Sequence, residues 1–166
     1  MGFLKGKTAI ITGAGRAVLT DGGCGSIGYG IATAYAKEGA NLVITGRNMQ
    51  KLLDAKEELE SKYGIKVLAV QADVSEGQDN KAVVENVVKQ AVDTFGGIDV
   101  LINNAAISHI GQMQDMDDET FRAIVDTNLS GAFYLSRAVL PDMVRRGSGR
   151  ILHIGSMWGK VGASCE

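Results

Sequence analysis

Residues 8–37, TAIITGAGRAVLTDGGCGSIGYGIATAYAK, decide the fold. Thr8–Thr12 is a short apolar run of strand-forming residues that ends in Gly13, and a helical pattern begins at Ser26 after a glycine-dense loop. A strand that turns through glycines into a helix can form a pyrophosphate site, because the backbone N–H groups approach the phosphates and the helix dipole faces them. With 22 glycines in 166 residues, such a loop needs support from the elements around it.

The composition is that of one soluble globular domain. A chain of 166 residues with 45% hydrophobic and 22% charged residues can bury a sizeable core. A net charge of −2 without a basic run argues against nucleic acid or an anionic membrane as a partner. No apolar run spans a membrane and no signal peptide precedes the first strand, so we expect a cytoplasmic protein. Cys24 and Cys165 match no metal-ligand spacing, and we expect reduced thiols and no metal site.

Strand-like and helical patterns alternate along the chain. Apolar runs of strand length are Ala9–Ile11, Leu42–Thr45, Val67–Val70, Val100–Ile102 and Ile151–Ile154. These runs are nearly continuous, which is typical of strands covered on both faces. Helical patterns separate them: one follows Asn48 as N-cap, one extends from Val84 to Phe95, and a fourth covers about Glu119–Arg146. The alternation predicts a doubly wound α/β fold with a parallel, Rossmann-like sheet.

Ligands of an open parallel sheet bind at the carboxyl ends of its strands. Arg47 follows the second strand, where a dinucleotide fold recognises the ribose 2′ position. An acidic residue there would accept a hydrogen bond from a free 2′-hydroxyl, whereas an arginine suits a 2′-phosphate through bidentate charge-assisted bonds. Arg47 therefore predicts NADP(H) as the cofactor. The alternative is a solvated surface arginine.

The third and fourth strands also end in polar candidates. Asp73 and Val74 follow the third strand, where a short acceptor could take the amino group of adenine; alternatively, Asp73 caps the following turn. Asn103 and Asn104 precede small residues after the fourth strand. This pattern suits a backbone packed tightly against a ligand, a turn that cross-links neighbouring strands, or both.

These motifs resemble those of the short-chain dehydrogenase/reductase family. Asn103–Ala106 is similar to its Asn-Asn-Ala-Gly motif, with the last glycine changed to alanine. Thr12-Gly13 with Ser26-Ile27-Gly28 resembles its glycine-rich loop, and Asp73 matches its adenine-binding aspartate. The resemblance covers the whole chain and implies a cofactor-binding domain with the predicted fold.

The resemblance also implies catalytic residues. Asn128, in the fourth helical segment, resembles the family's catalytic asparagine, and Ser156, just beyond the last strand, resembles its catalytic serine, which polarises the substrate carbonyl. The implied activity is NADP(H)-dependent interconversion of a ketone and a secondary alcohol. Among subfamilies the sequence is similar to 3-oxoacyl-carrier-protein reductases, which implies a 3-oxoacyl thioester-like substrate and, for a full-length chain, a homo-oligomer.

Two departures from the family pattern affect these expectations. Gly15–Gly25 is inserted where the family's loop has two residues; it folds over the phosphates, with Arg16 as a contact, or is a solvent-exposed insertion. The family's Tyr-x-x-x-Lys motif should begin just after Glu166. We therefore expect residues 1–166 to form a C-terminally incomplete NADP-binding domain. The alternative to an oxidoreductase is a truncated, catalytically inactive nucleotide-binding fragment.

The candidate residues fall into a catalytic and a cofactor-binding group. Catalytic candidates are Ser156 and Asn128. Cofactor-binding candidates are Gly13, Arg16, Ser26, Ile27, Gly28, Arg47, Asp73, Val74, Asn103 and Ala105. The expected partner is a small-molecule carbonyl or alcohol substrate.

Overall fold

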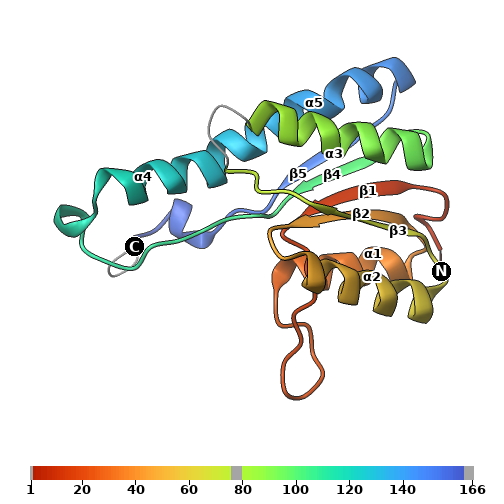
Figure 1. Cartoon of the computed structure of the whole chain (residues 1–166), viewed down its shortest axis with the longest axis horizontal. Coiled ribbons are helices and arrows are strands. Elements are labelled where there is room, and N and C mark those ends of the chain that lie inside the picture. Colours follow the sequence, from red (N-terminus) through yellow and green to blue (C-terminus); the bar gives the residue numbers. More distant parts are fainter. Residues whose placement is uncertain (1, 76–79, 163–166) are drawn as a thin grey trace.

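A computed structural model of the chain describes residues 2–75 and 80–162, with one parallel sheet between two layers of helices (Figure 1). The strands are β1 (Thr8–Thr12), β2 (Asn41–Gly46), β3 (Val67–Gln71), β4 (Val100–Asn103) and β5 (Arg150–His153). The helices are α1 (Ile27–Lys37), α2 (Met49–Tyr63), α3 (Asn80–Phe95), α4 (Asp118–Val125) and α5 (Gly131–Arg146). The strand order is β3-β2-β1-β4-β5. The predicted doubly wound fold is confirmed, and each predicted strand is present within one residue of its expected bounds.

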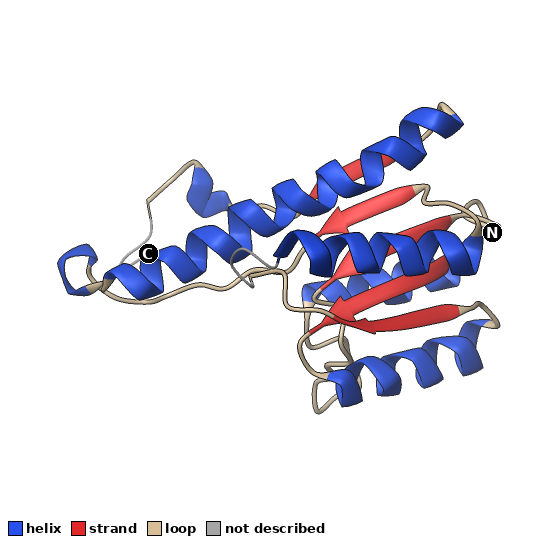
Figure 2. Ribbon diagram, turned by 45° about the horizontal axis from the view of Figure 1, so that its top comes forward, coloured by secondary structure: helices blue, strands red, loops and turns tan. Residues whose placement is uncertain are grey.

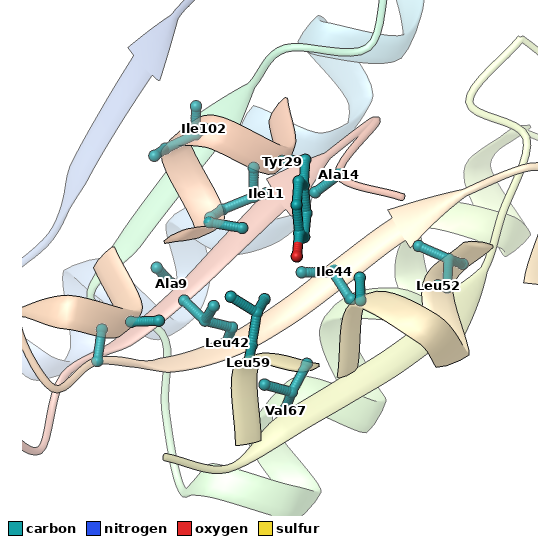
Figure 3. Close-up of a cluster of buried hydrophobic side chains, with 14 of the residues drawn as sticks. Ala9, Ile11, Ala14, Tyr29, Leu42, Ile44, Leu52, Leu59, Val67 and Ile102 are labelled. Carbon is teal, nitrogen blue, oxygen red and sulfur yellow. The ribbon is translucent and has the colours of Figure 1, made fainter. Parts of the chain in front are cut away.

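Continuous apolar strands are needed because both faces of the sheet are covered (Figure 2). Successive strand residues point to opposite faces, so Ile11 packs in a cluster with α1 and α2, while Ile10 packs in a second cluster with α3 and α5. Figure 3 shows the first cluster, in which Tyr29 of α1 and Leu59 of α2 lie over the central strands. These two clusters hold β1, β2 and β4 rigidly, and the loops that follow these strands start from fixed points.

The fourth helical segment differs from the continuous helix expected over about Glu119–Arg146. It consists of α4, a π-helical turn at Asp126–Ser130, and α5, and α4 projects beyond the sheet (Figure 1). π turns are rare and occur mostly as single turns inside α-helices, so a helical pattern in the sequence does not reveal one. The π turn contains Asn128, a predicted catalytic residue.

β5 also differs from expectation, because it is not covered on both faces. It forms an edge of the sheet beside β4, and Ile151 packs toward the α3 and α5 cluster. Leu152, which points to the opposite face, is 41% exposed. From the continuous apolar run in the sequence we expected more burial than this strand has.

Candidate functional site

A cleft lies at the carboxyl ends of the strands, where the strand order reverses between β1 and β4. Its volume is about 190 Å³. The loops after the first four strands and the π turn provide its lining: Gly13, Thr45, Gly46, Arg47, Ala72, Asp73, Val74, Asn104, Ala105, Ala106, Ile107 and Thr127. Such a switch point is where ligands bind in open α/β sheets. Of the predicted cofactor-binding residues, Gly13, Arg47, Asp73, Val74 and Ala105 line it.

The floor of the cleft is a hydrogen-bonded junction between the loops after β1 and β4. The Thr12 hydroxyl accepts hydrogen bonds from the backbone N–H groups of Asn104, at 2.9 Å, and Ala105, at 2.8 Å. The Asn104 side-chain amide donates to the Thr12 carbonyl at 2.8 Å. Both loops are therefore fixed to each other before any ligand binds.

Glycine is required at two positions beside this junction. Gly13 has a φ of +67°, which disfavours other residues. A Cβ on Gly28 would lie 2.3 Å from the Gly13 carbonyl oxygen and 2.6 Å from the Asn104 amide nitrogen. Ser26 caps α1 by accepting from the Tyr29 N–H at 3.4 Å, and Ile27 is exposed. The first turn of α1 thus reaches the junction closely, as binding of a pyrophosphate requires.

The loops after β2 and β3 place polar groups at the other side of the cleft. The Arg47 side chain is exposed, and no ion pair within the described part of the chain involves it. Asp73 accepts through Oδ1 from the Ser75 N–H, at 2.9 Å, and from the Ser75 hydroxyl, at 2.6 Å. Asp73 therefore caps the following turn, one of the two roles predicted for it, and its carboxylate also lines the cleft.

The structure does not bring Arg16 to the cleft, so the expected contact with the phosphates is absent from this arrangement. Its guanidinium Nε lies 2.6 Å from the Glu58 carboxylate on α2, and its N–H donates to the Lys51 carbonyl at 2.8 Å. The Arg16 guanidinium lowers the pKa of the Glu58 carboxyl. The rest of the insertion is an exposed hairpin closed by a bridge between Val18 and Cys24 (Figure 1). Of the two alternatives for the insertion, the structure has the solvent-exposed one.

Asn103 has the cross-linking role, one of those expected for the asparagine pair, and does not line the cleft. Its amide nitrogen lies 3.1 Å from the Ser136 hydroxyl on α5 and 3.4 Å from a ring nitrogen of His153 on β5. It therefore cross-links neighbouring elements, and Asn104 lines the cleft in its place. The alternation of side chains at a strand end is the sequence signal that separates the two asparagines.

Neither predicted catalytic residue lines the cleft. Asn128 forms a two-way bond with the backbone of Ile107: its amide oxygen accepts from the N–H at 2.9 Å and its amide nitrogen donates to the carbonyl at 2.8 Å. Asn128 thereby fixes the segment that leaves the cleft after β4. Ser156 is exposed and accepts from the Trp158 N–H at 3.2 Å.

Some residues of the cleft were not predicted. Thr45 and Gly46 end β2, Ala106 and Ile107 follow the asparagine pair, and Thr127 belongs to the π turn. The first four could have been predicted from the sequence, because they lie at the ends of strands. For Thr127, only its position next to Asn128 could have indicated a place in the cleft.

The described residues, 2–75 and 80–162, contain no helix that is both long and apolar enough to cross a membrane. They also contain no cluster of three or more histidine, cysteine, aspartate or glutamate residues suited to a metal ion. Cys24 is a free, exposed thiol, and Cys165 lies outside the described residues.

The strand order and the cleft at its switch point are the architecture of a doubly wound α/β fold. The family model for short chain dehydrogenase matches residues 7–166, and the chain belongs to this family. It is 47% identical over 168 residues to the 12alpha-hydroxysteroid dehydrogenase of a Clostridium species. The matched region covers 98% of this chain and 61% of that protein.

Two solved structures are similar to the chain throughout its length. An NAD+-bound xylitol dehydrogenase has a TM-score of 0.86 at 29% identity, over 98% of this chain and 58% of that one. L-sorbose reductase from Gluconobacter frateurii, complexed with NADPH and L-sorbose, has a TM-score of 0.82 at 33% identity, over 95% of this chain and 55% of that one. The chain thus spans less than two thirds of the length of these relatives, which include complexes of both nicotinamide cofactors.

Proposed function

We propose that the chain forms the NADP(H)-binding part of an oxidoreductase that interconverts a ketone and a secondary alcohol. The observation that carries the proposal is the cleft, which combines a glycine-lined junction beside the N-terminus of α1 with an arginine after β2. Arg47 has no ion-pair partner among the described residues, so its guanidinium is available for a 2′-phosphate. No carboxylate occupies the Thr45-Gly46-Arg47 segment, where a free 2′-hydroxyl would be recognised.

Different residues of this chain would bind the cofactor and orient the substrate. The junction around Gly13 and the first turn of α1 would bind the pyrophosphate, and Asp73 would accept from the adenine amino group. The bound cofactor would supply or take up the hydride. Ser156 would polarise the substrate oxygen by hydrogen bonding, and Asn128 would hold the Ile107 segment in place.

The proton-transfer step separates this proposal from its alternative. No Tyr-x-x-x-Lys sequence occurs between Ser156 and Glu166. The family resemblance implies a tyrosine and a lysine as the acid/base pair, and the alternative is nucleotide binding without turnover. NADPH oxidation with a panel of ketones, using mass-verified 166-residue protein, distinguishes the two.

For the substrate we infer a secondary alcohol or ketone with a bulky apolar body. The similarity to a hydroxysteroid dehydrogenase supports this class. A groove of about 730 Å³, lined in part by Met113, Met116 and Phe121, lies along the segment that continues from Ile107, and it would accept such a body. A 3-oxoacyl thioester is the second candidate, and both belong in the ketone panel. Cytoplasmic location and homo-oligomerisation stay predictions from the sequence.

Cofactor titration tests the proposal directly. Fluorescence titration should give NADPH about 10- to 100-fold tighter binding than NADH, because a charge-assisted hydrogen bond contributes about 1.5–3 kcal/mol. Arg47→Asp should abolish or reverse this preference. Arg16→Ala is the matched control and should retain it, because Arg16 is paired with Glu58 and does not line the cleft. Equal affinities of the wild type for the two cofactors would contradict NADP(H) selectivity.

A further inference from the structure

A buried side-chain amide joins β4, β5 and α5 next to the floor of the cleft. Asn103 ends β4, is 7% exposed, and stands directly opposite His153 in the register of β4 and β5. Its amide nitrogen faces the Ser136 hydroxyl of α5 at 3.1 Å and the Nδ1 atom of His153 at 3.4 Å. Its amide oxygen is buried and has no hydrogen-bond partner among the described residues. Such an acceptor needs an explanation, because buried polar atoms are generally hydrogen-bonded.

The protonation of His153 decides which end of this amide can face it. An amide nitrogen only donates, so the present arrangement requires an Nδ1 atom that accepts, with the ring proton on Nε2. In the imidazolium both ring nitrogens donate, and two donors would then face each other. Turning the Asn103 amide over removes this conflict, because it exchanges the nitrogen for the oxygen that has no partner. His153 is exposed, and histidine exchanges its proton with solvent between about pH 5 and 8.

The Ser136 hydroxyl can serve both orientations of the amide. It now accepts from the Asn103 amide nitrogen and donates to the Ala132 carbonyl at 2.7 Å. After the amide turns over, it can donate to the Asn103 oxygen instead, because a hydroxyl is both donor and acceptor. The buried oxygen then gains two donors, at the expense of the bonds that the amide nitrogen and the Ala132 carbonyl now have. The neutral partners therefore allow both orientations, and the proton on His153 can select between them.

No charged side chain competes with the amide for His153. The neighbouring strand β4, Val100–Asn103, contains no charged residue, and α5 faces the pair with the neutral Ser136. Arg137, which follows Ser136, lies over two aromatic rings of its own helix. Within the described part of the chain, no ion pair involves His153. The orientation of the amide is therefore coupled to the protonation of His153 itself.

We propose that His153 and Asn103 form a pH-sensitive hydrogen-bond switch, in which protonation of His153 turns the Asn103 amide over. The switch lies between two parts of the candidate site. The Asn103 carbonyl accepts from the Ile154 N–H at 2.9 Å, two residues before Ser156, and the next residue, Asn104, belongs to the floor of the cleft. His153 is thus a positioning residue that acts through Asn103. The switch requires only the contacts within this chain, so it does not depend on the proposed function.

NMR spectroscopy of the imidazole and amide nitrogens tests the switch. The chain has two histidines, so His109→Gln is the matched control for His153→Gln. At about pH 8 the wild type should show the Nε2–H tautomer of His153. Between about pH 8 and pH 5 the side-chain amide resonances of Asn103 should shift with the same midpoint as the His153 ring. His153→Gln should abolish this shift, because glutamine can accept from the amide but does not titrate, and His109→Gln should retain it.

The other outcomes are also decisive. Asn103 amide resonances that do not change with pH, or that change with a midpoint other than that of the His153 ring, would overturn the switch. The Nδ1–H tautomer at about pH 8 would overturn it too, because the neutral ring would already donate to the amide. A shift that persists in His153→Gln would assign it to another group. If His153→Gln does not fold, the two wild-type measurements still decide, and none of these outcomes affects the test of cofactor binding.

Discussion

At the amino end of the sheet the buried charges form ion pairs, whereas the polar side chains that line the cleft at the carboxyl end bind backbone or a neighbouring hydroxyl, or have no protein partner. Asp99, beside β4, accepts from the Thr8 N–H at 2.9 Å and from Arg146 at 2.8 Å. Asp142 of α5 accepts from the Ile98 N–H at 2.9 Å. Burial opposes ionisation of both carboxyls, but the backbone N–H and arginine bonds outweigh it and lower the pKa of each.

The carboxyl end has no comparable ion-pair network among the described residues. There Thr12 and Asn104 tie two loops together through neutral hydrogen bonds. Arg47 and Thr127 line the cleft without protein partners in the described chain. Paired charges fix where strands begin and where α5 ends, and unpaired groups on a fixed frame are available for a ligand. The difference leads us to expect that substitutions at the amino end change stability alone, and that substitutions at the carboxyl end also change cofactor binding.

The largest effect should come from Gly28→Val at the carboxyl end. A side chain there meets the Gly13 carbonyl and the Asn104 amide at distances that force the backbone to move. We expect the free energy of unfolding to fall by more than about 3 kcal/mol and NADPH binding to be lost. Urea denaturation and cofactor titration measure the two effects.

Gly30→Ala, on the same helix, is the matched control for Gly28→Val. A Cβ on Gly30 would meet only the Cys24 Cβ, at an ordinary 3.6 Å. This variant should bind NADPH normally and be as stable as the wild type or up to about 1 kcal/mol more stable, because alanine favours the helix. Normal binding by Gly28→Val would show that the close approach of α1 is not needed for the site.

The sequence was sufficient for the frame of this site and insufficient for the direction of its side chains. Continuous apolar runs and glycines located the strands and the cleft, since both follow from local patterns. Arg16 and Asn103 contact residues far away in sequence, Glu58 and Ser136, and local patterns do not show such partners. Thr127 was missed because the periodicity of its segment reveals only the apolar face and not the π turn.

A somewhat smaller effect, confined to stability, is expected for Asp99→Ala at the amino end. Removing this carboxylate leaves the Thr8 N–H without its acceptor and leaves Arg146 with only its longer contact to Asp142, at 3.5 Å. The free energy of unfolding should fall by about 3 kcal/mol, and the dissociation constant for NADPH should not change. Asp93→Ala, which removes an exposed pairing with Lys89, is the control and should change stability by less than about 0.5 kcal/mol.

The Asp99 carboxylate should also affect the stability of the protein at acidic pH. Because the pKa of Asp99 is lowered in the folded protein, its ionised form stabilises the fold above the ordinary carboxyl pKa of about 4. That contribution disappears as the pH falls from about 5 through the lower folded-state pKa. Urea midpoints measured from pH 6 downward should therefore decline less steeply for Asp99→Ala than for the wild type. Parallel curves would show that Asp99 does not contribute to the acid sensitivity.

The smallest effect on stability is expected for Thr12→Val, and this variant tests the comparison most sharply. The Thr12 hydroxyl is the acceptor for two backbone N–H groups, those of Asn104 and Ala105, at the floor of the cleft. Without this hydroxyl, the free energy of unfolding should fall by about 2 kcal/mol, because two desolvated N–H donors lose their acceptor. The loops after β1 and β4 would no longer be fixed to each other, and NADPH affinity should fall about fivefold. Thr12→Ser keeps the acceptor and should restore the affinity. A Thr12→Val variant that lost stability but bound NADPH normally would behave like an amino-end variant, and the division between the two ends would then be wrong.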